Sequence, residues 1–229
     1  MSRTNEFIER IKERGSSSSF ERRTFLRLHC NEAAIDAVND YLTKQTDRPL
    51  VLTGDCGMGK DHLMYRLTYL KNLKAMHLSA EYLLNLLQSM KISIDEIDVS
   101  VLAQEYEFFR LDVAQLLQRS ENPHSWNQFL MSLAKTGCKT VMTMDRFVGV
   151  NQPDNEAILA HIGPMSEHDI LTLSKFYFVH EFGYEPQEDE DLRLCSENLL
   201  EQTQSCRTIA GSMKKARMIR EMRDSQEES

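Results

Sequence analysis

The sequence has no long apolar run, no closely spaced pair of cysteines and no excess of positive charge. Its longest apolar stretches are only a few residues long, which excludes a transmembrane helix. The N-terminal segment is charged and lacks the apolar core of a secretory signal. The five cysteines are scattered and form no C-x-x-C motif. This excludes a disulfide framework and a simple zinc motif, and it predicts a reducing, cytoplasmic compartment.

The charge balance is acidic, with 35 Asp and Glu against 27 Lys and Arg and a net charge of −8. This argues against a protein whose whole surface coats nucleic acid, although a local basic patch is compatible with it. The hydrophobic fraction of 41% and the length of 229 residues are those of a soluble globular chain. A chain of this size buries enough surface to fold without a metal or a disulfide.

Three regions follow one another along the chain. We predict an N-terminal helix and a flexible serine linker over 1–19, an α/β domain over 20–163, and a helical subdomain with a short disordered C-terminus over 164–229. In the middle region short apolar strands alternate with helices, which predicts a parallel sheet with helices on both faces. The strands are expected at 48–54, 74–78, 107–113 and 139–145, and the helices at 32–42, 62–70, 80–90 and 125–135.

A helix-start signal opens the helical subdomain. Ser166 and Asp169 frame the sequence S-E-H-D, a variant of the capping box in which Asp takes the place of Glu. Helices are expected at about 167–182, 190–203 and 206–222.

The strongest motif lies in a glycine-rich turn between a predicted strand and a predicted helix. Residues 54–61 read G-D-C-G-M-G-K-D and match G-x-x-x-x-G-K. Its glycines let successive backbone N–H groups point at one anion, and the helix that follows adds the positive end of its dipole. A glycine-rich turn without a ligand is the alternative. The motif predicts that ATP or ADP is bound by Gly54, Asp55, Cys56, Gly57, Met58, Gly59, Lys60, Asp61 and His62.

Asp61 departs from this motif, which requires Ser or Thr at that position. A hydroxyl ligates Mg²⁺ without adding negative charge near the phosphates. Three outcomes fit the sequence: Asp61 ligates Mg²⁺, repels the nucleotide, or pairs with Lys60 in an empty site. A pair of unit charges at about 4 Å is worth roughly 4 kcal/mol at an effective dielectric of about 20, so this residue decides whether the loop is occupied.

Four segments, in the same order, resemble the DnaA and Hda AAA+ ATPases. The loop sequence G-M-G-K-D-H-L at 57–63 resembles that family's G-x-G-K-T-H-L, and L-S-A-E-Y at 78–82 is similar to V-S-A-E-x-F. V-M-T-M-D-R at 141–146 resembles V-I-T-S-D-R, and S-C-R-T-I-A-G at 205–211 resembles the sensor 2 helix. Helicase loaders of the DnaC type fit almost as well. The resemblance implies an AAA+ P-loop domain over 20–163 and a helical lid over 164–229.

The resemblance also implies roles for single residues. Asp112 matches the Walker B carboxylate, which with Asp61 would hold a metal. Asp145 or Thr143 matches sensor 1, and Arg207 matches sensor 2 and would touch the γ-phosphate. Ordinary alternatives are a strand-end polar residue for Asp112 and a helix-start arginine for Arg207.

Catalytic features of that family are missing from this sequence. Its Walker B motif carries two adjacent acids, whereas here a single Asp112 follows a strand that contains Arg110. No arginine occurs between Arg146 and Arg193, so the family's arginine finger, a feature worth about 10³–10⁵ in rate, is absent. We therefore expect ATP or ADP to be bound but hydrolysed weakly or not at all, with Mg²⁺ as a second candidate ligand.

The implied function is a regulator or helicase loader in the initiation of DNA replication. Its partners would be DnaA, the replicative helicase or DNA, and a homo-oligomer is compatible with the family. The charged segment 1–15 is a candidate docking peptide, with Phe7, Ile8 and Ile11 as a narrow apolar stripe. A pseudo-ATPase scaffold with an empty loop is the alternative, and an active ATPase the third. The basic side of the last helix is either a DNA contact or a solvated lid surface, and it carries Lys214, Lys215, Arg217, Arg220 and Arg223.

Overall fold

The chain divides into two compact units. The computed structural model describes residues 2–14, 25–112, 123–145 and 157–182. One unit comprises Met1–Phe25, Ala34–Gly54 and Lys60–His161, and the other comprises Leu26–Ala33, Asp55–Gly59 and Ile162–Ser229. The division into three regions at 1–19, 20–163 and 164–229 stays a prediction.

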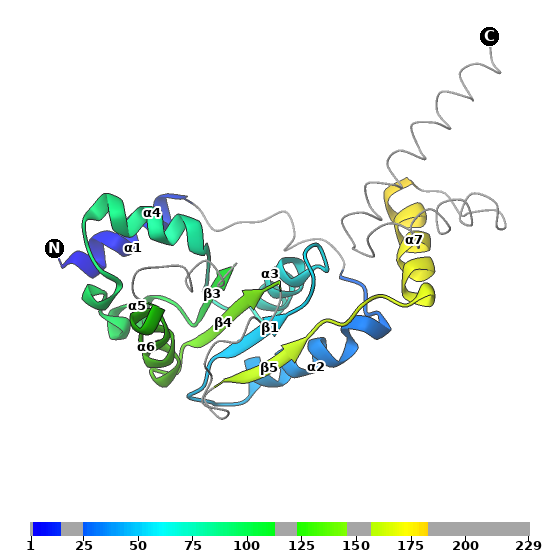
Figure 1. Ribbon diagram of the computed structural model, residues 1–229, viewed down its shortest axis with the longest axis horizontal. Helices are drawn as coiled ribbons and strands as arrows, with labels where there is room; N and C mark the ends of the chain where they lie inside the picture. The colour runs from blue at the N-terminus through cyan, green and yellow to red at the C-terminus, as the bar shows by residue number, and fades with distance from the viewer. Residues whose placement is uncertain (1, 15–24, 113–122, 146–156, 183–229) are drawn as a thin grey trace, which may run out of the picture. The chain divides into compact units, whose positions relative to one another are not determined.

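A five-stranded parallel sheet lies in the first unit. Its strands are β1 (Leu50–Thr53), β2 (Ala75–Ser79), β3 (Phe108–Asp112), β4 (Lys139–Met144) and β5 (Ile158–His161). The order across the sheet is β2-β3-β4-β1-β5, and every neighbouring pair is parallel. In Figure 1, β3, β4, β1 and β5 can be followed side by side in this order. The predicted α/β fold with a parallel sheet is confirmed.

Most helices belong to the same unit as the sheet. These are α1 (Arg3–Arg14), α3 (Lys60–Leu70), α4 (Ala80–Met90), the short 3₁₀ helix η2 (Ile94–Glu96), α5 (Val99–Glu105) and α6 (Pro123–Lys135). Helix α2 (His29–Thr43) begins in the second unit and continues into the first, and α7 (Glu167–Phe182) belongs to the second. The four helices predicted for the α/β domain are confirmed to within a few residues. Across the part of the chain that the structure describes, no helix has the length and apolar character needed to cross a membrane.

Strand β5 is a strand that the sequence does not predict, and the short helices η2 and α5 lie in a stretch that the sequence also leaves unassigned. It pairs with β1 at the edge of the sheet, from Leu50 opposite Ile158 to Thr53 opposite His161. Only Ala160 of its four residues is buried, and Leu159 is exposed. A strand this short and this open lacks the continuous apolar run that marks a central parallel strand.

One face of the sheet carries the apolar core of this unit. Phe109 and Leu111 of β3 are buried there among residues of α1, α4, α5 and α6. Helix α1 contributes Phe7, Ile8 and Ile11, which are all buried in that core. Its apolar stripe therefore faces the body of the unit and is closed to a partner, whereas docking through the charged side of 1–15 stays a prediction.

The predicted capping box starts α7 in the second unit. The Ser166 amide donates to Asp169 Oδ2 at 3.0 Å, and the Asp169 amide donates to Ser166 Oγ at 3.2 Å. The other oxygen of Asp169 accepts from the His29 amide at 2.7 Å. Burial raises the pKa of Asp169, but these hydrogen bonds outweigh it and hold the pKa below its ordinary value. The helix expected at 167–182 is confirmed, and those expected at 190–203 and 206–222 lie outside the described residues.

Candidate functional site

Charged side chains gather where strands β1, β3 and β4 end and helix α3 begins. Ligand sites of open parallel sheets lie at this carboxyl edge. Four residues singled out in the sequence meet here, namely Lys60, Asp61, Asp112 and Asp145. They come from positions far apart in the chain, and the parallel register of the strands brings them together.

The loop that precedes Lys60 in the chain has the backbone that its glycines allow. Gly57 and Gly59 both have φ of 83°, a conformation that residues with a Cβ rarely adopt. The Met58 amide donates to the Asp55 carbonyl at 3.3 Å and closes a turn between them. The G-x-G pair at 57–59 is therefore required by local geometry.

Lys60 is the first residue of α3, and its side chain is buried. Its Nζ donates to the Gly54 carbonyl at 2.7 Å and to Asp145 Oδ1 at 2.9 Å. Gly54 follows β1 and Asp145 follows β4, so the ammonium group links the ends of two neighbouring strands. The side chain of Asp145 is 41% exposed, which leaves this end of the ion pair open to solvent.

Arg110 lies in the middle of β3 and is only 2% exposed. Its guanidinium group donates to Asp61 Oδ1 through Nη2, and the same nitrogen lies 3.3 Å from Asp112 Oδ1. The group also lies over the ring of Tyr65, at 5.4 Å from the ring centroid. Its Nε is buried without a hydrogen-bond acceptor. Two of the departures from the family sequence, Asp61 and Arg110, are thus partners of each other.

Asp112 connects the ends of β3 and β4. Its Oδ1 accepts a hydrogen bond from Thr143 Oγ1 at 2.7 Å, and the Thr143 side chain is fully buried. Both residues matched family positions in the sequence. In the structure they form one contact, which fixes the carboxylate beside Arg110.

The imidazole ring of His77 lies beside Arg110 in this site and is neutral. His77 of β2 stands opposite Arg110 in the sheet and stacks on Tyr65, with ring centroids 4.1 Å apart. Its Nε2 lies 3.3 Å from Thr68 Oγ1. Burial, reinforced by the nearby charge of Arg110, lowers the pKa of His77 to about 3. Nothing in the sequence pattern marks His77 or Tyr65, because their contacts cross from β2 to α3.

The charges of the site nearly balance one another. Lys60 and Arg110 are positive, and Asp61, Asp112 and Asp145 are negative, which leaves one negative charge when all five are ionised. Burial raises the pKa of Asp61, the Arg110 charge opposes the rise, and the Asp112 charge adds to it. Asp61 therefore loses its charge at a higher pH than an ordinary aspartate.

Other predicted site residues flank Lys60 and Asp61 in the chain. His62 packs edge-on against the ring of Phe25, with ring centroids 5.1 Å apart. The loop residues 55–59 belong to the second unit. Arg207 and the basic helix at 214–223 lie outside the described residues. The nucleotide and metal roles given to these residues in the sequence stay predictions.

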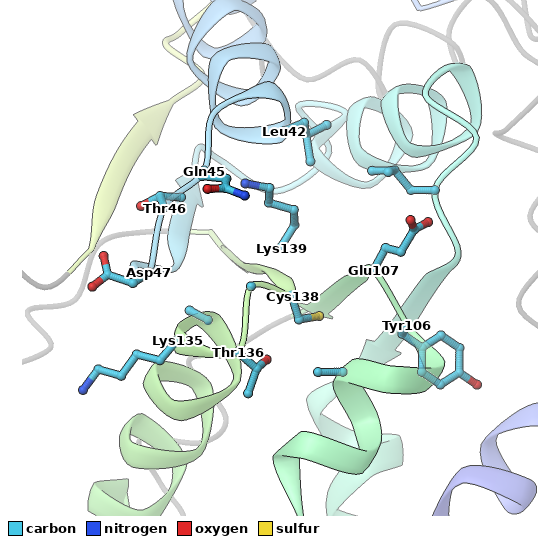
Figure 2. A pocket seen from close by; sticks show the side chains of 14 residues that line it. Leu42, Gln45, Thr46, Asp47, Tyr106, Glu107, Lys135, Thr136, Cys138 and Lys139 are labelled. Carbon is cyan, nitrogen blue, oxygen red and sulfur yellow. The ribbon is translucent and has the colours of Figure 1, made fainter.

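A hollow of about 790 Å³ lies at the opposite edge, beside the beginnings of β3 and β4 (Figure 2). Its polar groups serve the structure: Lys139 Nζ donates to the Lys44 carbonyl, and Glu107 accepts from the Lys74 amide at 2.9 Å. Burial raises the pKa of the Cys138 thiol to about 12, so it stays protonated and unreactive. The carboxyl edge is therefore the stronger candidate site.

Comparisons with known proteins identify the fold. No protein-family model and no curated protein matches this sequence. Domain III of the Thermotoga maritima replication initiation protein DnaA superposes with a TM-score of 0.66 at 18% identity, over 91% of each chain. AMPPCP-bound DnaA from Aquifex aeolicus gives 0.66 at 18% identity, over 86% of this chain and 64% of that one. The replication initiator DnaA bound to AMPPCP and single-stranded DNA gives 0.62 at 18% identity, over 89% and 68%.

The chain therefore has an α/β AAA+ fold. More particularly, the fold is that of domain III of DnaA, as the sequence resemblance predicted. The chain spans about two thirds of the longer DnaA structures and nearly all of the isolated domain.

Proposed function

We propose that this protein is a DnaA-like AAA+ protein of DNA replication initiation that binds ATP or ADP and hydrolyses it weakly or not at all. It acts in the cytoplasm as a regulator or helicase loader. Its contacts are with replication proteins such as DnaA or the replicative helicase, or with DNA.

The position of Lys60 carries the nucleotide part of this proposal. The lysine follows the G-M-G turn directly, opens α3, and is held by Gly54 and Asp145 at the carboxyl edge of the sheet. A phosphate loop needs this order of strand, glycine turn and helix, with a lysine that reaches the β- and γ-phosphates. The DnaA structures bound to AMPPCP share the fold that supplies this order.

The surroundings of Asp112 support weak hydrolysis. ATP hydrolysis needs a group that orients the attacking water. Asp112 is the last residue of β3, and its Oδ1 accepts from Thr143 and lies 3.3 Å from Arg110. With the carboxylate held in this way and no second acid beside it in the sequence, we expect slow turnover.

A role in replication rests on the fold of the neighbours. One solved structure similar to this chain is a replication initiator bound to single-stranded DNA, and another is a domain of a replication initiation protein. The sequence resemblance to the DnaA and Hda ATPases points in the same direction. Regulator and loader are both compatible with little hydrolysis, because either can act through contacts that a bound nucleotide switches.

A scaffold with an empty phosphate loop is the second candidate. It is favoured by the charge balance of the site, since Lys60 already pairs with Asp145 and Arg110 with Asp61. In that case the ion pairs hold the edge of the sheet together and no nucleotide is needed. An active ATPase is the third candidate.

Calorimetric titration of ATP and ADP tests the proposal. We expect micromolar binding by the wild type, loss of binding in Lys60→Ala, and turnover well below about 1 s⁻¹. Lys44→Ala is the matched control, because Lys44 is 71% exposed and its ammonium group pairs with Asp40, one turn earlier in the chain. Thermal unfolding of each variant shows whether it is folded. Absence of binding at millimolar nucleotide would favour the scaffold, and fast turnover lost in Lys60→Ala would favour the active ATPase.

A further inference from the structure

Arg110 lies between the two carboxylates to which the family resemblance gives a metal. Asp61 occupies the P-loop position that ligates Mg²⁺, and Asp112 occupies the Walker B position. In the structure both carboxylates meet one nitrogen of Arg110, by a hydrogen bond to Asp61 and at 3.3 Å from Asp112. Asp61 and Arg110 are 49 residues apart in the sequence, yet each supplies the charge that the other lacks.

The burial of Arg110 makes this pairing obligatory. Its side chain is 3% exposed, whereas that of Asp61 is 45% exposed. A buried cation needs carboxylates and hydrogen bonds around it, because water does not solvate it. A hydroxyl at position 61 would leave the guanidinium with Asp112 as its remaining carboxylate. The aspartate at the P-loop position is therefore explained by the arginine in the strand.

Mg²⁺ does not fit this donor set. The ion needs near-octahedral oxygen ligands at about 2.0–2.1 Å, and it is usually held by one or two carboxylates. Here the carboxylate oxygens that would serve already face a fixed positive charge, which would repel a divalent ion. Among the described residues, no group of three or more His, Cys, Asp or Glu side chains is placed to hold a metal.

We propose that Arg110 takes the position of the divalent ion in this phosphate-loop site, so that the nucleotide is bound without Mg²⁺. This inference rests on the nucleotide binding proposed above. A guanidinium group is a natural substitute, because it is always charged and its planar donors match phosphate oxygens. The Nε of Arg110 is buried without an acceptor, which is uncommon for a polar atom.

The experiment compares nucleotide binding with and without Mg²⁺ and uses Mn²⁺ alone as a spectroscopic probe. For the wild type, the calorimetric Kd for ATP should differ by less than about threefold between EDTA and excess Mg²⁺. Paramagnetic resonance should detect no bound Mn²⁺ in the protein without nucleotide. Arg110→Val removes the positive charge from both carboxylates and should gain a Mn²⁺ site, whereas Arg48→Val, which removes an exposed arginine elsewhere, should not.

A second variant tests the inference if Arg110→Val does not fold. Asp61→Thr combined with Arg110→Val removes both charges together and restores the family residue at position 61. Its ATP affinity should become dependent on Mg²⁺, with binding at least about tenfold weaker in EDTA.

The outcomes separate the two proposals. ATP binding by the wild type that requires Mg²⁺ overturns the inference and leaves the proposed nucleotide binding intact. Absence of ATP binding under every condition overturns the proposed function. The Mn²⁺ measurements then decide the role of Arg110: a site gained in Arg110→Val supports it, and no Mn²⁺ site in a folded Arg110→Val overturns it.

Discussion

Strand β3 faces two environments that are stabilised by different forces. On one side Phe109 and Leu111 lie in the apolar core with α1, α4, α5 and α6. On the other side Arg110 is held by Asp61 and Asp112 and lies over Tyr65. The apolar face gains free energy from burial itself, whereas the charged face is stable only while each charge keeps its partner. The candidate site therefore lies on the charged face, whereas most of the stability of the unit comes from the apolar face.

Among the substitutions proposed here, one on the apolar face of β3 should lower the free energy of unfolding most. Phe109 is 1% exposed and meets Phe129 edge-on, with ring centroids 5.9 Å apart. Phe109→Ala leaves a cavity and should lower the free energy of unfolding by about 3–5 kcal/mol in urea titrations. Leu70→Ala, at a residue 58% exposed, should change it by less than about 0.5 kcal/mol. Equal effects of the two variants would show that this face is not the core.

The charged face differs from the apolar face because it makes the free energy of unfolding depend on pH, through His77. The pKa of His77 is lowered to about 3 in the folded chain, against about 6.5 in an unfolded one. Between these values only the unfolded chain takes up the proton, so the free energy of unfolding falls as the pH falls from about 6.5 towards about 3. Between about pH 7 and pH 4 the wild type should lose roughly 3 kcal/mol more than His77→Gln.

Denaturant unfolding at several pH values measures this difference. His168→Gln, which changes an exposed histidine, should keep the pH dependence of the wild type. Parallel pH profiles for the wild type and His77→Gln would contradict a neutral, buried His77.

Arg110 and Asp61 form a buried ion pair, and removal of one partner should lower the free energy of unfolding more than removal of the other. Asp61→Asn leaves the buried guanidinium with one carboxylate and should lower the free energy of unfolding by about 2 kcal/mol. Arg110→Leu leaves Asp61, which reaches solvent, and should lower it by about half as much. A double-mutant cycle in urea measures both effects and their coupling. A larger loss in Arg110→Leu than in Asp61→Asn would contradict the argument from burial.

Loss of the hydrogen bond from Thr143 to Asp112 should have the smallest effect on the free energy of unfolding. Thr143→Val keeps the shape of a fully buried side chain but removes its hydrogen bond to Asp112 Oδ1. We expect a loss of about 1 kcal/mol in the free energy of unfolding. The exposed Thr43→Val, which removes hydrogen bonds to backbone carbonyls of its own helix, should change it by less than about 0.5 kcal/mol.

Much of the fold could be predicted from local patterns. The apolar runs of β1 to β4, the G-M-G-K turn and the S-E-H-D cap each act within a few residues, so the sequence carries their signal directly. Strand β5 has no such signal, because it is short and mostly exposed. Helix α1 shows its apolar stripe in the sequence, but only tertiary structure shows that this stripe is buried.

The candidate site could be predicted only in part. The loop and Lys60 follow from the motif, and the family resemblance marks Asp112, Thr143 and Asp145. The pairing of Asp61 with Arg110 could not be predicted, because it joins a helix to a strand far along the chain. The sequence left open whether Asp61 binds a metal, repels the nucleotide or pairs with Lys60. The contact with Arg110 is none of these three.

The thermal midpoint of unfolding with and without ATP tests the central claim, nucleotide binding by this phosphate loop, most directly. Bound ligand stabilises the folded chain, so at ATP about 100 times above Kd the wild type should gain roughly 5–10 °C. Lys60→Ala should gain nothing. An unchanged midpoint for the wild type at millimolar ATP would contradict the account and leave a DnaA-like fold whose phosphate loop is empty.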